Sequence, residues 1–230
     1  MTNTLHRFGK PDDLKDDYIV FTLTSSGIND IGAVQKARDF LRVALKYKPV
    51  NLRGNTKYGP IFRPEKNLNP LKLYVRGRKE TVPPEQVMEE MRPPGSALVV
   101  FNKKQALEGF LKEIGEMDLG LSVNVSSLVE DIREMAPRTG IWPHSINYAL
   151  GFRGNLYRLP DQHVLALTTM CGHGLIASNF AKKMIDMVKE KRLTPEKATS
   201  YMAKFCVCGA FNTSRAVRIL REARMWKSNV

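Results

Sequence analysis

The chain has 230 residues, enough for one sizeable hydrophobic core or for a main domain with a smaller subdomain. Apolar residues make up 43% and charged residues 26%, which is ordinary for a globular protein, and the net charge is +13. No apolar run approaches a membrane span, and the polar residues 1–15 lack the apolar centre of a signal peptide. We therefore expect a cytoplasmic protein with no membrane partner.

Strands and helices are expected to alternate over the first part of the chain. The apolar, β-branched run Tyr18–Leu23 predicts a buried strand, and Asn29 or Asp30 is expected to cap a helix that ends near Tyr47. Ser127-x-x-Glu130 resembles a capping box and predicts another helix. Further strands are expected at 71–75, 97–101, 119–125 and 144–150, and further helices from Pro83-Pro84 and over 104–117.

The positive charge is concentrated in one stretch. Residues 36–80 contain thirteen Lys and Arg against three Asp and Glu, so they supply ten of the thirteen net charges. Within this stretch, residues 49–70 carry four prolines and two glycines, which predicts an irregular and exposed insertion. Such a surface suits an anionic substrate, an acidic partner or nucleic acid. No aromatic-rich binding motif accompanies the charge, so nucleic acid is kept as an alternative partner.

The pattern of the last third of the chain predicts one strand followed by three helices. The strand is expected at His163–Leu167, and the helices are expected to begin near Ala177, at Thr194-Pro195 and at Asn212-Thr213-Ser214. In the last helix we expect the apolar residues to face inward and the arginines outward. The sequence thus predicts an α/β or mixed α+β body over residues 1–160 and a C-terminal unit over 161–230, packed together as one compact domain.

The strongest chemical signal is a pair of cysteine motifs in the C-terminal unit. One is Cys171-Gly172-His173-Gly174, and the other is Cys206-Val207-Cys208-Gly209. Two helices between them would form a hairpin that returns the second motif to the first. Three thiolates and one imidazole would then meet at one point, as in a metal site, an iron–sulfur cluster or a thiol redox centre. Cys171, His173, Cys206 and Cys208 are therefore the predicted ligands.

An iron–sulfur cluster is the leading expectation for this ligand set. Structural zinc usually takes its thiolates from Cys-x(2–4)-Cys pairs, and Cys-x-Cys and Cys-x-His are tighter. Three cysteines match a four-iron (4Fe-4S) cluster whose remaining iron is left open or bound by His173. Zinc, metal-free thiol chemistry and simply buried cysteines are the alternatives.

Two other histidines are candidates for acid–base roles beside His173. His144 follows Trp142-Pro143, and His163 follows Asp161-Gln162, each at the start of an expected strand. Either histidine would act as a general acid or base if it faced the cluster. The alternative for each is a hydrogen-bonded residue at the end of a strand.

Three functions follow from these observations. The first is an iron–sulfur enzyme of lyase or oxidoreductase (reductase) type, in which the basic stretch attracts a small anionic substrate. The second is a zinc-stabilised basic module that binds nucleic acid. The third is an electron-transfer or redox-sensing protein with a redox partner, in which the cluster has four protein ligands.

Overall fold

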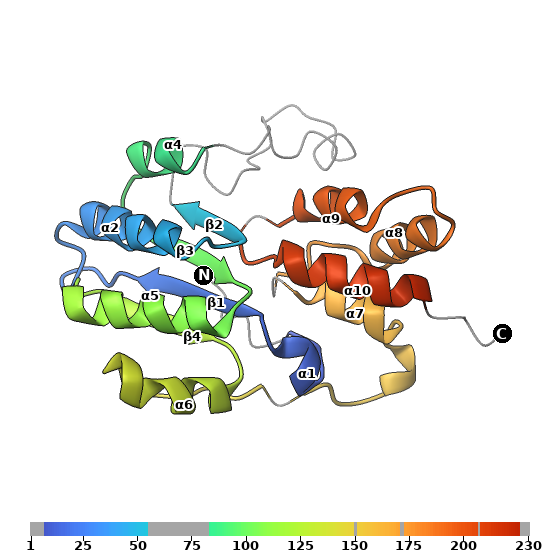
Figure 1. The fold of residues 1–230 in the computed structure, drawn as a ribbon, viewed down its shortest axis with the longest axis horizontal. Coiled ribbons are helices and arrows are strands. Elements are labelled where there is room, and N and C mark those ends of the chain that lie inside the picture. The colour runs from blue at the N-terminus through green and yellow to red at the C-terminus, as the bar shows by residue number, and fades with distance from the viewer. Residues whose placement is uncertain (1–6, 55–82, 150, 171–172, 207, 226–230) are drawn as a thin grey trace.

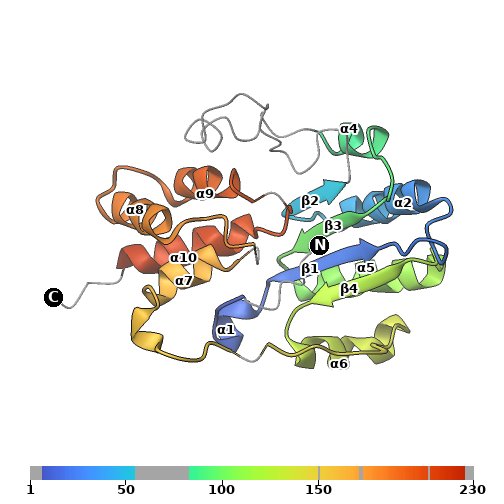
Figure 2. The same ribbon diagram turned by 180° about the vertical axis from the view of Figure 1, so that it is seen from behind.

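The computed structural model describes residues 7–54, 83–149, 151–170, 173–206 and 208–225. It shows a mixed α+β fold with a four-stranded antiparallel sheet in the order β2-β3-β1-β4 (Figures 1 and 2). The strands are β1 (Tyr18–Leu23), β2 (Asn51–Gly54), β3 (Ala97–Phe101) and β4 (Ser122–Ser126). The predicted strands at 18–23 and 97–101 are confirmed. The strand predicted at 71–75 lies outside the described residues.

The two faces of the sheet are covered by different helices. Successive side chains of a strand point to opposite faces, so Tyr18 and Val20 join one apolar cluster and Ile19 and Phe21 join the other. The first cluster packs under the helices of the N-terminal half: α2 (Ala33–Lys46), α4 (Pro84–Glu89), α5 (Lys104–Met117) and α6 (Val129–Thr139). A short helix α1 (Pro11–Leu14) precedes β1.

The second cluster joins the sheet to the C-terminal helices, which lie together at the right of Figure 1. After a short 3₁₀ turn at Leu156–Arg158, these are α7 (Gln162–Thr168), α8 (Ser178–Lys189), α9 (Pro195–Ala203) and α10 (Thr213–Met225). Apolar residues of β1 and β3 and of all four helices belong to this one cluster. The C-terminal helices therefore share a core with the sheet.

The strand predicted at His163–Leu167 is wrong, because this segment is helix α7. The side chain of Asp161 accepts a hydrogen bond from the backbone N–H of His163 and so caps the first turn. The apolar run is buried on all sides, and a short continuous run of that kind does not distinguish a strand from a buried helix. Among its described residues the C-terminal unit thus contains four helices, where one strand and three helices were expected.

Other local predictions also need correction. Residues 144–149 form no strand, because this segment is exposed and has no pairing partner among the described residues. Helix α6 begins without the capping box, since its N-cap is Leu128 and no side chain caps it. Likewise α2 begins after Gly32, and the side chains of Asn29 and Asp30 instead accept hydrogen bonds within the preceding loop.

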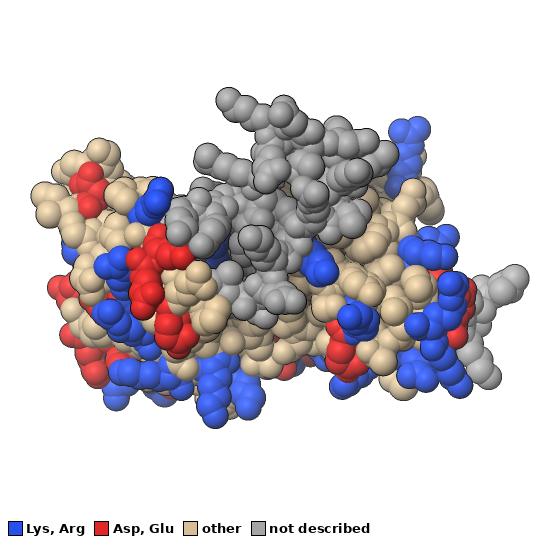
Figure 3. Space-filling model, turned by 90° about the horizontal axis from the view of Figure 1, so that it is seen from above, with Lys and Arg blue, Asp and Glu red and all other residues tan. Residues whose placement is uncertain are grey.

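Charges of both signs lie on one face of the molecule. On the face drawn in Figure 3, Lys and Arg side chains stand among Asp and Glu side chains at both ends of the molecule. Within the described part of the chain, every helix is too short or too polar to cross a membrane.

Candidate metal centre

Cys206 and Cys208 lie in a buried turn between α9 and α10. The backbone N–H of Cys206 donates to the carbonyl of Ala203 at 3.1 Å, which closes the end of α9, and Gly209 turns the chain with φ +74°. Both cysteines are buried, with exposed fractions of 0% and 3%. Their Sγ atoms lie 3.7 Å apart, and the N–H of Phe211 donates to the Sγ of Cys206 at 3.3 Å. The turn therefore presents two sulfur atoms side by side.

The sulfur–sulfur distance indicates which chemistry suits the pair. A disulfide bond joins its sulfur atoms at about 2.05 Å, so these are two separate thiols. Two thiolates that bind one tetrahedral metal ion at about 2.3 Å lie about 3.8 Å from each other. The separation of 3.7 Å matches two ligands on one metal atom, and it equally matches two thiols in direct S–H···S contact.

The other predicted ligands are less completely described. Cys171 and Gly172 lie outside the described residues, and His173 is exposed. Met170 and Ile176, on either side of this stretch, are buried in the same apolar cluster as Cys206 and Cys208. Two residues that flank the first motif therefore share this cluster with the second motif. In the part of the chain that the structure describes, no group of three or more His, Cys, Asp or Glu side chains forms a metal site.

Strand β2 holds the turn from the side of the sheet. The side-chain amide of Asn51 donates to the carbonyl of Phe211 at 3.0 Å. Gly209 approaches so closely that a Cβ added there would lie 2.8 Å from the Cβ of Arg53 and 3.3 Å from the carbonyl oxygen of Leu52. Both a left-handed backbone and close contact thus require glycine at this position.

We expect Gly209→Ala to destabilise the chain more than Gly140→Ala, a matched control. Gly140 also has a positive φ, of +71°, but a Cβ there meets no atom within 4 Å. The left-handed backbone costs each variant about 1–2 kcal/mol, and the clash adds about 1–3 kcal/mol at residue 209. Urea unfolding of both variants measures the difference, and equal losses of stability would contradict the close packing of this turn.

Arg53 places a positive charge beside the cysteine turn. Burial lowers the pKa of its guanidinium group, and the sulfur atoms of Cys208 and Cys206 act in the opposite direction. The sequence pattern predicts residues 49–70 to be irregular and exposed, but residues 51–54 form β2 and Arg53 is only partly exposed. The pattern failed here because β2 is short and lies next to prolines and glycines.

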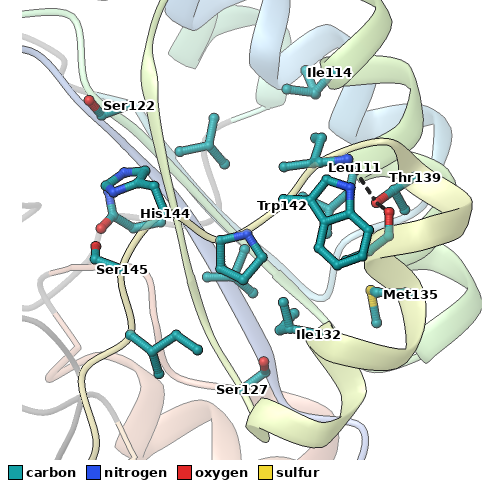
Figure 4. Close-up of a pocket in the computed structure, with 18 of the residues that line it drawn as sticks. Leu111, Ile114, Ser122, Ser127, Ile132, Met135, Thr139, Trp142, His144 and Ser145 are labelled. Atoms are coloured by element: carbon teal, nitrogen blue, oxygen red, sulfur yellow. Dashed lines mark hydrogen bonds between the residues drawn. The ribbon is translucent and has the colours of Figure 1, made fainter.

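The histidines predicted to act as acid or base occupy different settings. His163 is tied to the start of α7, where its Nδ1 lies 3.1 Å from the carboxylate of Asp161. His144 is exposed and lines a pocket of about 620 Å³ between α5, β4 and α6. Figure 4 shows it beside Ser145, on the other side of the view from Trp142 and Met135. The lining of this pocket includes neither Cys206 nor Cys208.

Sequence reasoning missed a buried ionic cluster that anchors the start of α10. The carboxylate of Asp17 accepts hydrogen bonds from Arg215 at 2.9 Å and from Asn212 at 3.0 Å, and Arg7 lies 2.7 Å from it. Arg215 is 2% exposed, so the prediction that the arginines of this helix face outward is wrong for this residue. Burial lowers the pKa of Arg215, and the nearby Asp17 carboxylate opposes that change.

This cluster fixes the cysteine turn from its C-terminal side. Asn212 caps α10 by accepting a hydrogen bond from the N–H of Arg215 at 2.9 Å, and its amide also donates to the carbonyl of Asp16 at 3.1 Å. The only sequence signal was the presence of Asn212 and Arg215 three residues apart at the start of a helix. That spacing predicts a cap but does not identify Asp17 as the partner.

Comparison with protein-family models, with curated protein sequences and with solved structures found no match to this chain. Its function is therefore inferred from the chemistry of the cysteine turn.

Proposed function

We propose that this chain is an iron–sulfur protein of reductase type, in which Cys206 and Cys208 bind the same iron atom. The observation that carries this proposal is the 3.7 Å separation of their buried sulfur atoms. Cys171 and His173 are the proposed ligands of a second iron, since a two-iron cluster takes two protein ligands on each metal. An iron–sulfur cluster supplies one-electron redox chemistry when it is bound.

The surroundings of the turn suit a buried anionic centre. The hydrogen bond from the N–H of Phe211 to Cys206 stabilises a thiolate, and hydrogen bonds to sulfur are among the features that tune such clusters. The positive end of α10, which begins at Thr213, lies just beyond the turn. Both features lower the cost of holding negative charge inside an apolar core.

The shared metal favours a two-iron cluster over a four-iron cluster. In a four-iron cluster each iron takes one protein ligand, so neighbouring thiolates diverge to separate metal atoms. Cys206 and Cys208 would have to move apart to bind in that way. With all four protein ligands in use, a two-iron centre leaves no open iron for a lyase reaction. We therefore propose electron transfer to a small anionic substrate, with a redox partner as electron donor.

Metal analysis of protein prepared without oxygen tests this proposal. We expect about two iron and two sulfide per chain, a brown colour, and an electron paramagnetic resonance signal after one-electron reduction. Four iron and four sulfide per chain would contradict the shared iron atom. A colourless chain with one zinc, or a chain that retains no metal, would overturn the iron–sulfur proposal.

A zinc-stabilised module that binds nucleic acid is the second candidate, because one zinc ion fits the same sulfur–sulfur distance and the net charge is +13. This candidate predicts one zinc per chain and binding to RNA or DNA that weakens steeply as salt rises. Absence of binding at moderate salt by a zinc-loaded chain would remove it.

A further inference from the structure

Strand β2 directs two polar side chains at the cysteine turn. In its antiparallel pairing with β3, Asn51 lies opposite Val100 and Arg53 lies opposite Leu98. Side chains of directly opposed residues share one face of a sheet. Leu98 and Val100 belong to the apolar cluster that contains Cys206 and Cys208, so Asn51 and Arg53 also face that cluster.

Contacts along β2 confirm this orientation. Asn51 reaches the carbonyl of Phe211, and Val50 accepts a hydrogen bond from the hydroxyl of Thr213 at 3.4 Å. The backbone of Gly209 packs against the Cβ of Arg53. The base of the Arg53 side chain is therefore held against the turn that carries both sulfur atoms.

Arg53 differs from the other arginine that faces this core. Arg215 has a buried carboxylate as its partner, whereas among the described residues no carboxylate compensates Arg53. The buried Nε atoms of both arginines make no hydrogen bond. A positive charge taken from water into an apolar setting is costly unless a negative charge compensates it. As thiolates, Cys206 and Cys208 would supply that negative charge.

We propose that Arg53 is the counter-charge of the metal–thiolate centre and that it sets the reduction potential and metal retention of that centre. This inference rests on the proposed function, since it requires Cys206 and Cys208 to hold a metal. With three thiolates and a neutral His173 as ligands, an oxidised two-iron cluster would carry a net charge of −1, and one-electron reduction would make it −2. The guanidinium group stabilises the reduced form more than the oxidised form, so it raises the potential.

Three variants separate the charge of Arg53 from its packing. Arg53→Met keeps the length of the side chain and removes the charge, and Arg53→Lys keeps the charge. Arg42→Met is the matched control, because Arg42 is an exposed arginine of α2 whose loss changes the net charge equally. The potential of the bound cluster and the rate at which a chelator removes the metal are measured for each variant.

We expect Arg53→Met to disfavour reduction at least tenfold, a lowering of about 59 mV for one electron. It should also release its metal at least tenfold faster than the wild type. Arg53→Lys should stay within threefold of the wild type in both measurements, and Arg42→Met should not change. The inference is overturned if Arg53→Met holds its metal at an unchanged potential and release rate, or if Arg53→Lys departs from the wild type as far as Arg53→Met.

Two further outcomes are also decisive. If Arg53→Met does not fold or does not bind its metal, the Arg53→Lys variant provides the test. A normal metal centre in Arg53→Lys supports the role of the charge, and loss of the metal centre in Arg53→Lys overturns it. Failure of the proposed function looks different, because it appears in the wild type. If the wild type binds zinc, the iron–sulfur proposal is wrong, and the role of Arg53 is then tested by the rate of metal release alone. If the wild type binds no metal, both the proposed function and the proposed role of Arg53 are wrong.

Discussion

Cys206→Ser and Cys208→Ser are each expected to lose the bound metal. Each substitution removes one of two thiolates that lie 3.7 Å apart, and a serine hydroxyl is a harder and weaker ligand for iron or zinc. Loss of a supporting hydrogen bond around a metal ligand typically lowers affinity about 10–100-fold, and loss of the ligand itself should cost more. Metal and sulfide content per chain, measured after anaerobic purification, tests this expectation.

Ala203→Ser provides the control for these substitutions. It introduces the same hydroxyl group into the same apolar cluster at a buried position next to the turn, and it leaves both sulfur atoms in place. We expect it to retain its metal. If the cysteine variants keep as much metal as Ala203→Ser, the turn is not the metal centre and the two thiols are simply part of the core.

Arg215→Met is expected to lower the free energy of unfolding by about 1.5–3 kcal/mol, because it removes the charge-assisted hydrogen bonds of a buried pair, while Arg7 remains beside the Asp17 carboxylate. Both side chains of the Arg215–Asp17 pair are 0% exposed. The substitution also removes a hydrogen bond from Arg215 to the carbonyl of Phe8 at 2.7 Å. The loss should therefore weaken the attachment of the N-terminal segment to α10, which the bond from Arg218 to the carbonyl of Asp13 still supports.

Arg221→Met in the same helix is the matched control. Arg221 pairs with Glu196 at 2.7 Å, but these side chains are 65% and 55% exposed, and such pairs contribute about 0–1 kcal/mol. Denaturant unfolding with linear extrapolation compares the two variants. Equal stabilities for Arg215→Met and Arg221→Met would show that the buried pair does not anchor the helix.

The sequence predicted those elements whose pattern is long or whose ends are marked. The strand at 18–23, the helix over 104–117 and the Thr194 cap of α9 are confirmed. The strand is a buried apolar run, the helix has a clear apolar periodicity, and Thr194 is a capping residue followed by proline. The segment 163–167 was assigned wrongly because four consecutive buried apolar residues satisfy both a buried strand and a short buried helix.

The site was only partly predictable for a related reason. The proximity of Cys206 and Cys208 follows from their spacing, but the roles of Arg53 and Arg215 depend on tertiary contacts. Both are charged residues that local patterns assign to the surface, and each instead faces the core that joins the sheet to the C-terminal helices. A single sequence does not show which arginine will have its charge compensated by a carboxylate or thiol far away in the chain. The prediction that Cys171 and His173 complete the site remains a prediction.

X-ray absorption spectroscopy at the metal edge tests the shared metal atom most directly. For the wild-type chain we predict a first shell dominated by sulfur at about 2.3 Å, with an iron neighbour beyond it and fewer sulfur scatterers in Cys208→Ser. A first shell of nitrogen and oxygen alone, or one that Cys208→Ser leaves unchanged, would contradict the assignment of this turn as the metal centre.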